Sequence, residues 1–218
     1  DADPESIEKI KENNKIAEVY PYCLLDNKKN INFNITSDPH ASSIYNLNQK
    51  YKFYFTEHKK YDYLFSEALK VEKKINLSTI SIDELVKQNK TPQPDYLSID
   101  AEGAEYLILK GANNCLENNT VAIFVETNLL ELYENQSTFK DIHEHLNLKN
   151  FILADMEISR FHYKRINKKL RGKNMPFCSD TMYFKDPKVL FDDIVKYNKS
   201  DNALKKLAFI SFVYGFNE

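Results

Sequence analysis

The clearest pattern in this sequence is a short apolar run followed by a segment with helical spacing. Residues 96–99 have the length of a strand, and apolar side chains then recur at helical intervals over residues 105–116. Residues 120–126 form a second, nearly unbroken apolar run, which predicts a buried parallel strand. Strand, helix and strand in this order predict the α/β class, with a mostly parallel sheet and flanking helices.

The remaining elements are predicted from the same kinds of pattern. Further strands are expected at residues 16–25, 31–35, 151–153 and 180–185, and helices at residues 4–13, 82–88, 137–146, 187–197 and 202–216. Residues 50–80 are rich in aromatic and charged side chains, and we interpret them as a β-rich insertion or lid with a short helix at residues 63–69. Since no repeat or low-complexity linker interrupts the chain, we predict an α/β domain over residues 1–186 and a helical tail over residues 187–218.

Polar side chains follow both of the central predicted strands. Asp100 and Glu102 close the first strand, and Glu126 and Asn128 close the second. Ligands of open α/β sheets bind beyond the carboxyl ends of the strands, so we expect these side chains to border one site. Gly103 lets the backbone turn there and lets a ligand approach closely. A second interpretation stays open, because a carboxylate in the first turn of a helix gains about 0.3–1 kcal/mol from the helix dipole.

Composition limits the class of protein. The 218 residues are 42% hydrophobic, enough for a packed core, and the net charge of −2 does not favour a nucleic-acid partner. Cys23, Cys115 and Cys178 are widely spaced and indicate neither a zinc site nor a disulfide framework, so a cytoplasmic location is expected. We find no signal-peptide pattern and no apolar run of the roughly 20 residues that a membrane span requires.

Residues 95–112 resemble the signature of a known family. They include Leu97-Ser98-Ile99-Asp100-Ala101-Glu102-Gly103-Ala104-Glu105, and the apolar helix that follows ends in Lys110-Gly111-Ala112. This is similar to the signature of FkbM-type S-adenosylmethionine-dependent methyltransferases, which reads roughly apolar-Lys-apolar-Asp-x-Glu-Gly-x-Glu and continues into a helix that ends in Lys-Gly-Ala. Ser98 stands where that family frequently has Lys. The resemblance is most specific over residues 95–128.

The resemblance implies a fold, a cofactor and an activity. The fold would be Rossmann-like, of the class I methyltransferase type, and a methyl group would pass from S-adenosylmethionine to a hydroxyl of a sugar, glycan or natural product. The cofactor-binding residues would be Asp1, Asp3, Asp100, Ala101 and Glu102, with Asp1 on the ribose hydroxyls. The alternative for Asp1 and Asp3 is that they only cap the first helix.

The start of the chain departs from the family pattern. Position 1 is Asp rather than Met, and the four glycines form no glycine-rich loop that could hold a nucleotide. We therefore expect the chain to be truncated at its N-terminus, after the first strand and cofactor loop of the family. Ser42 and Ser43 match the Ser-Ser-apolar element that such chains often carry near the active cleft, and we expect them to bind substrate.

A basic segment lies between Glu157 and Asp180. It contains no acidic residue and holds all three arginines of the chain. The planar guanidinium group suits phosphate and carboxylate, so we predict that Arg160, His162 and Arg165 bind an anionic or nucleotide-linked acceptor. The alternative is a solvated loop without a ligand.

The reaction that the resemblance implies needs an aligned acceptor hydroxyl and a group that takes its proton. Asp100, Glu102 and Glu126 are the predicted catalytic residues. Asp100, Glu126 and Asn128 could also hold a divalent cation through oxygen ligands, although a metal is not part of the prediction.

Two other classes of function stay open. One is a metal-dependent glycosyltransferase with Asp100-Ala101-Glu102 as its acidic motif, and the other is a non-catalytic, methyltransferase-like scaffold. The sequence upstream of Asp1 would separate the enzyme from the scaffold. The expected partner is a small-molecule or glycan acceptor, and the apolar residues 207–216 would suit a homo-oligomer formed through the C-terminal helix.

Overall fold

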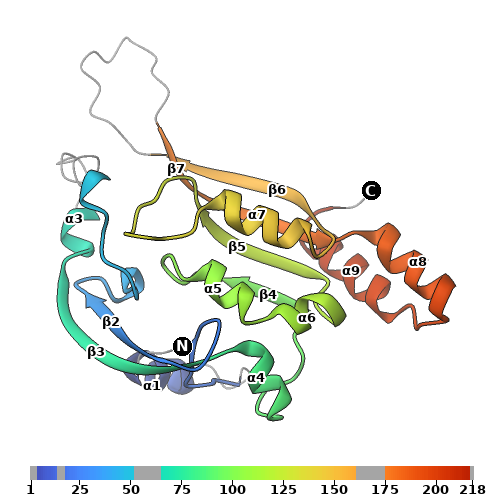
Figure 1. The fold of residues 1–218 in the computed structure, drawn as a ribbon, viewed down its shortest axis with the longest axis horizontal. Helices are drawn as coiled ribbons and strands as arrows, with labels where there is room; N and C mark the ends of the chain where they lie inside the picture. The colour runs from blue at the N-terminus through green and yellow to red at the C-terminus, as the bar shows by residue number, and fades with distance from the viewer. Residues whose placement is uncertain (1–3, 14–17, 52–64, 161–174, 217–218) are drawn as a thin grey trace, which may run out of the picture.

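The computed structural model describes residues 4–13, 18–51, 65–160 and 175–216. They form two β-sheets with helices packed around them (Figure 1). The larger sheet has the strand order β4 (Tyr96–Ile99), β5 (Ala122–Asn128), β7 (Pro176–Lys185) and β6 (Phe151–Arg160). The smaller sheet has the order β1 (Cys23–Leu24), β3 (Val71–Ile80) and β2 (Asn30–Thr36). The predicted α/β class is therefore confirmed.

Both sheets are mixed. In the larger sheet β4 and β5 are parallel, and β7 is antiparallel to both of its neighbours. Strands β4, β5 and β6 consequently run in one direction and β7 runs in the other. In the smaller sheet β1 is parallel to β3 and β2 is antiparallel to it. The prediction of a mostly parallel sheet is thus confirmed only in part.

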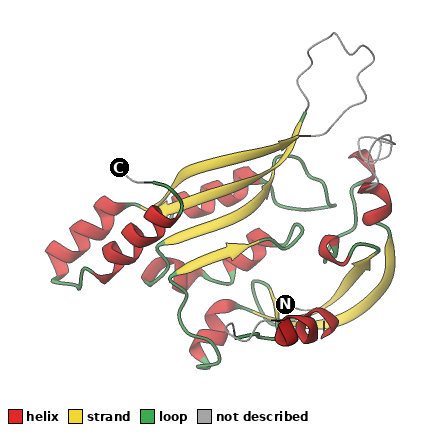
Figure 2. Cartoon of the chain, turned by 180° about the vertical axis from the view of Figure 1, so that it is seen from behind, coloured by secondary structure: helices red, strands yellow, loops and turns green. Residues whose placement is uncertain are grey.

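The two faces of the larger sheet bury different clusters. Successive side chains of a strand point to opposite faces, and on β5 Ile123 and Val125 pack in one cluster with α5 (Glu105–Lys110), α6 (Asn113–Asn118) and α7 (Phe139–Asn147). Ala122 and Phe124 belong to a second cluster together with Leu207 of α9. Figure 2 shows α8 (Pro187–Tyr197) and α9 (Asn202–Val213) as a pair at one end of this sheet. That end of the second face is therefore covered, and the other end carries the carboxylates described below.

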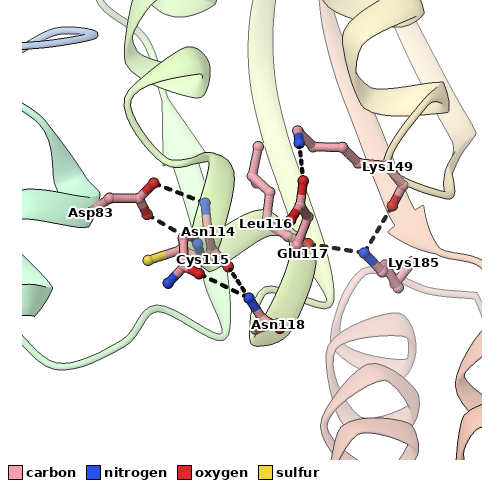
Figure 3. Close-up of polar contacts among 8 residues, drawn as sticks. All are labelled: Asp83, Asn114, Cys115, Leu116, Glu117, Asn118, Lys149 and Lys185. Carbon is pink, nitrogen blue, oxygen red and sulfur yellow. Dashed lines mark hydrogen bonds and ion pairs between the residues drawn. The ribbon is translucent and has the colours of Figure 1, made fainter.

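The helix predicted after β4 is broken into α5 and α6 at Gly111. A Cβ atom at this position would lie 2.2 Å from the carbonyl oxygen of Leu25, so only glycine lets the two backbones approach so closely. Asp83 of α4 (Ile82–Lys87) then caps α6, because its carboxylate oxygens accept hydrogen bonds from the backbone N–H groups of Asn114 (2.8 Å) and Cys115 (3.0 Å) (Figure 3). The break therefore results from a packing contact that lies far away in the sequence.

The opposite end of α6 is held by a buried lysine. Lys185 Nζ, at the end of β7, donates hydrogen bonds to the carbonyl oxygens of Leu116 (2.9 Å) and Lys149 (2.8 Å), as Figure 3 shows. Burial lowers the pKa of Lys185 to about 8, because it disfavours the charged amine. These contacts tie α6 and the end of α7 to the sheet.

Several predicted boundaries differ from the observed ones. The strand predicted at residues 16–25 is reduced to β1 within the described residues, and Pro21 there has no N–H to donate to a sheet. Strands β6 and β7 are longer than predicted, because they pair with each other along almost their whole length. The remaining helices are α1 (Pro4–Asn13), α3 (Phe65–Ala68), η1 (Pro39–Ala41) and η2 (Gln49–Tyr51). No helix among the described residues combines the length and the apolar content needed to cross a bilayer.

Candidate active site

Carboxylates from β4, β5 and the start of α5 meet at the carboxyl ends of the parallel strands. Ile99 and Val125 are register partners, so Asp100 and Glu126 follow them on adjacent strands. Carboxylate oxygens of Asp100, Glu105 and Glu126 all lie within 4.8 Å of one another. The structure thus brings together two of the three predicted catalytic side chains.

The acidic character continues across the sheet. Glu126 is the register partner of Asp180 on β7, and Asp180 is in turn the partner of Glu157 on β6. Directly paired residues share one face of a sheet, so Glu126, Asp180 and Glu157 form a row of carboxylates over β5, β7 and β6, and Asp100 adjoins this row beside Glu126. Asp180 was not predicted as a site residue, because its place in this row depends on the antiparallel register of β7.

The turn after β4 has an unusual backbone, which its own acidic residue stabilises. Glu102 and Gly103 both have positive φ angles, 47° and 99°. Oε1 of Glu105 accepts hydrogen bonds from the backbone N–H groups of Ala101 (2.8 Å) and Gly103 (3.0 Å). The Glu105 carboxyl group is buried, which raises its pKa to about 7 although these hydrogen bonds favour the charged form. Glu105 therefore closes the turn as well as contributing to the acidic cluster.

Glu102 is fixed by residues from two distant loops. The hydroxyl of Tyr133 donates a hydrogen bond of 2.6 Å to Oε2 of Glu102, and the hydroxyl of Ser43 donates one of 2.6 Å to its carbonyl oxygen. Burial raises the pKa of the Glu102 carboxyl group, and the Tyr133 hydrogen bond acts in the opposite direction. The carboxylate of Glu102 is thus held by Tyr133, and its charge acts on the neighbouring carboxyl groups of Glu105 and Glu126.

Three aromatic and amide side chains cover Gly103. A Cβ atom at Gly103 would lie 3.1 Å from Tyr133 and 3.3 Å from both Tyr45 and Gln136. Gln136 accepts a hydrogen bond from the backbone N–H of Tyr133 (3.1 Å), while its buried Nε2 has no hydrogen-bond partner among the residues that the structure describes. The loops that carry these residues are joined by a hydrogen bond from the N–H of Glu134 to the carbonyl of Asn46 (2.9 Å). No short motif in the sequence marks Tyr45, Tyr133 or Gln136.

Glu126 has the environment of a proton acceptor for near-neutral pH. Burial and the neighbouring charges of Glu102, Asp100, Glu105 and Asp180 raise its pKa to about 8. Its side chain is only half-buried and adjoins the exposed Asp100. Burial and the charges of Asp100 and Glu157 also raise the pKa of Asp180. The cluster can therefore exchange a proton near neutral pH and attract a cationic ligand.

The other predicted site residues have different environments. The hydroxyl oxygen of Ser42 accepts a hydrogen bond from the backbone N–H of Thr36 (3.2 Å), so it fixes a loop of the chain itself. Asn128 is buried and lies on the same side of β5 as Glu126, two residues further along the strand. Arg160 is exposed at the end of β6. The remaining predicted residues, Asp1, Asp3, His162 and Arg165, lie outside the described residues.

A hollow of about 430 Å³ lies between β2 and α5, away from the row of carboxylates. Its lining comes from β2, β3, α5, the turn between β1 and β2 and the loop that follows β2: Leu25, Lys29, Ile31, Asn32, Asn34, Ile44, Tyr45, Asn46, Lys74 and Leu107. Tyr45 is the residue that this hollow shares with the cover over Gly103. The carboxylates at the strand ends therefore do not line this hollow.

Comparison with known proteins decides the family. The sequence profile described as "Methyltransferase FkbM domain" matches residues 3–153, which is more than half of the chain. The chain belongs to the FkbM methyltransferase family. The match includes β4, the turn at Gly103, α5 and β5, so the resemblance seen in residues 95–128 is confirmed.

A curated relative gives weaker and more local support. Over 53 residues the chain is 38% identical to a protein named hexuronic acid methyltransferase AglP from Haloferax volcanii. The matched segment covers 24% of this chain and 22% of that protein, so the two share only about a fifth of their lengths. No solved structure gives a significant match to this FkbM-family chain.

Proposed function

We propose that this FkbM-family protein is an S-adenosylmethionine-dependent O-methyltransferase that acts on a hydroxyl of a sugar, glycan or natural-product acceptor. The observation that carries the proposal is the meeting of the Asp100 and Glu126 carboxylates at the ends of β4 and β5, beside Glu105. Family membership makes methyl transfer the favoured reaction of such a site. The cofactor, when bound, supplies an electrophilic methyl group that an acceptor oxygen can displace.

Glu126 is the best-suited group to take the proton of the acceptor hydroxyl. A general base is most effective when its pKa lies near the working pH, and the pKa of Glu126 is about 8. Asp100 is exposed next to it and can orient the acceptor hydroxyl or the cofactor through a hydrogen bond. Glu102 is the third proposed residue, and the Tyr133 hydroxyl keeps its carboxylate in one orientation.

The chemistry of these side chains fits the cofactor. S-Adenosylmethionine carries positive charge on its sulfonium and ammonium groups, and the strand ends present several carboxylates. Asp100 and Glu102 are therefore the proposed contacts from the turn. The backbone N–H of Ala101 is already bonded to Glu105, and its carbonyl accepts the N–H of Ala104 at 3.2 Å, so the Ala101 backbone offers a ligand only the second lone pair of that carbonyl. The proposed roles of Asp1 and Asp3 rest on the family signature alone.

An anionic sugar is the proposed class of acceptor. The name of the archaeal relative refers to a hexuronic acid, and this chain places Arg160 at the end of β6, on the strand that carries Glu157. A guanidinium group can bind a sugar carboxylate through two parallel hydrogen bonds. His162 and Arg165, two and five residues further on, are proposed to belong to the same binding segment, and Ser42, Ser43 and Asn128 to border the acceptor.

Methyl transfer to a panel of sugars tests this function. The full-length protein is incubated with labelled S-adenosylmethionine and with glucuronic acid, its glycosides or neutral hexoses, with and without a chelator. We expect labelled methyl ether on an acidic sugar, and a loss of rate in Glu126→Gln. Glu144→Gln, which removes an exposed carboxylate on α7, is the matched control and should keep the wild-type rate. Absence of transfer to any hydroxyl would contradict the proposal.

A further inference from the structure

The helical pair α8–α9 carries an apolar surface that the rest of the described chain does not cover. Phe191 and Val195 on α8 are 58% and 68% exposed, and Phe209, Phe212 and Val213 on α9 are 62–69% exposed. We call these five residues the C-terminal apolar face. Figures 1 and 2 show the two helices side by side at the end of the sheet, on the opposite side of the molecule from β2.

The exposed apolar residues recur at helical intervals, so on each helix they lie along one side and are not scattered around it. On α9 the buried Leu207 and half-buried Ile210 face the sheet, while Phe209, Phe212 and Val213 lie on the other side of the helix. On α8 Phe191 and Val195 are one turn apart. Each helix therefore has an outward apolar stripe as well as an inward one.

The helices bury little surface for their length. No residue of α8 is buried and only Leu207 of α9 is. Helices shorter than about 12–15 residues are marginal in water without tertiary packing, and most of the stability of a helix in a protein comes from a buried apolar face. The pair would therefore gain stability from further burial of its outward face.

The size of the face suits a second copy of the chain. An aromatic side chain offers about 150–250 Å² of surface, so the three phenylalanines, which are 58–69% exposed, together with the two smaller valines expose on the order of 500 Å². This is at the upper end of the largest apolar patch on an ordinary monomer, about 300–600 Å². It also approaches the roughly 800 Å² that each partner buries in a standard protein interface, and surrounding polar residues would supply the remainder.

The charges around the face distinguish a second copy from a lipid surface. Residues 186–213 contain five lysines and four aspartates, which leaves a net charge of +1. Lys199–Asp193 and Lys205–Asp201 are already ion pairs within the chain. Binding to anionic lipid uses clusters of about four to eight basic residues, which this balanced rim does not provide. With a net charge of only +1, this rim opposes the approach of a second copy of the chain very little.

We propose that the C-terminal apolar face, formed by Phe191, Val195, Phe209, Phe212 and Val213, is the self-association surface of a homodimer. The interface is isologous, so each residue of the face meets the same face of the partner. It lies at the end of the sheet away from the carboxylates at the ends of β4 and β5, which leaves both active sites open. This proposal does not depend on the proposed reaction.

Sedimentation of the full-length protein over a range of micromolar concentrations tests the proposal. We expect a dimer for the wild type, and a dissociation constant weaker by on the order of 100-fold for the double variant Phe209→Ser, Phe212→Ser. Leu148→Ser is the matched control, because Leu148 is 79% exposed beyond α7 and lies outside the face. It should sediment as the wild type does.

A second variant keeps the test decisive if the double variant is unstable. Val195→Lys changes an exposed position of the face without removing any buried side chain, and it should weaken the dimer because each copy would bring an unpaired charge into the interface. A wild type that stays monomeric throughout, or a dimer unaffected by changes in the face, would overturn the proposal. So would a monomer that floats with phosphatidylserine vesicles, since the face would then bind lipid.

Discussion

The Tyr133 hydroxyl donates a hydrogen bond of 2.6 Å to Oε2 of Glu102, across more than thirty residues of sequence. It connects the loop after β5 to the turn after β4, where Glu102 has a φ of 47° that non-glycine residues rarely adopt. The contact therefore fixes both the orientation of a carboxylate and the shape of the turn that presents Asp100.

Tyr133→Phe should destabilise the protein. The substitution keeps the buried ring but removes the donor, so the largely buried Glu102 carboxylate is left without this partner. We expect the free energy of unfolding to fall by about 1–3 kcal/mol. Denaturant unfolding of the variant is the measurement, and Tyr197→Phe, on an exposed ring of α8, is the control. Equal losses in the two variants would show that the hydrogen bond contributes nothing.

Glu126→Gln should change the pH dependence of methyl transfer. The pKa of Glu126 is about 8, so the wild-type rate should rise with pH through this value as the carboxylate ionises and can take a proton. A glutamine side chain cannot take up this proton, so we expect the rate of methyl transfer to be lower by about 10²–10⁴-fold and to show no inflection near pH 8. Rate–pH profiles of both proteins check this. A variant with an unchanged inflection would assign the titration to another group.

The acidic cluster should make the protein more stable at mildly acidic pH. Burial and the charges of Glu102, Asp100, Glu105 and Asp180 raise the pKa of Glu126 from 4.5 to about 8, so the folded state holds a proton that the unfolded state releases. The stability from this group is present in full below about pH 4.5 and is lost as the pH rises through 8. Thermal unfolding between pH 5 and 9 should show a decline that is smaller in Glu126→Gln. Equal slopes would contradict the assignment.

Gly111→Ala should be far more damaging than Gly215→Ala. A Cβ atom at Gly111 would lie 2.2 Å from the carbonyl oxygen of Leu25, whereas nothing lies within 4 Å of one at Gly215. We expect a loss of about 3 kcal/mol or more at Gly111, because one of two backbone segments must move. At Gly215, where φ is +85°, the conformational cost should be about 1 kcal/mol. Denaturant unfolding of the two variants is the measurement. Equal losses of stability would contradict the inference that the close contact between the Gly111 and Leu25 backbones requires glycine at the break between α5 and α6.

The sequence was sufficient for the parts of the site that depend on neighbouring parallel strands. Asp100 and Glu126 were expected to meet because the parallel strands β4 and β5 end at the same edge, and the structure brings them together. Asp180 was missed because its position follows from the antiparallel pairing of β7, which no local pattern specifies. Tyr133 was not predicted for a similar reason, because its hydrogen bond to Glu102 joins two loops that are far apart in the sequence.

Helix boundaries show the same division between local and distant causes. The start of α4 at Ile82 agrees with the helix predicted at residues 82–88, and the side chain of Ser81 caps it by accepting the backbone N–H of Glu84 at 3.2 Å. The break at Gly111 was not predicted, because it depends on Leu25 from another part of the chain. Helix caps formed by neighbouring residues could therefore be predicted from the sequence, whereas close contacts between backbone segments far apart in the sequence could not.

We propose that the carboxylates at the ends of β4 and β5 form the cofactor side of a methyltransferase site. Calorimetric titration of the full-length protein with S-adenosylhomocysteine, repeated with Asp100→Ala and with the control Glu144→Gln, tests it most directly. We expect saturable heat for the wild type and the control, and an affinity weaker by about tenfold or more for Asp100→Ala, since a hydrogen bond to a charged group contributes about 1.5–3 kcal/mol. No heat from the wild type, or equal affinities in all three proteins, would contradict it.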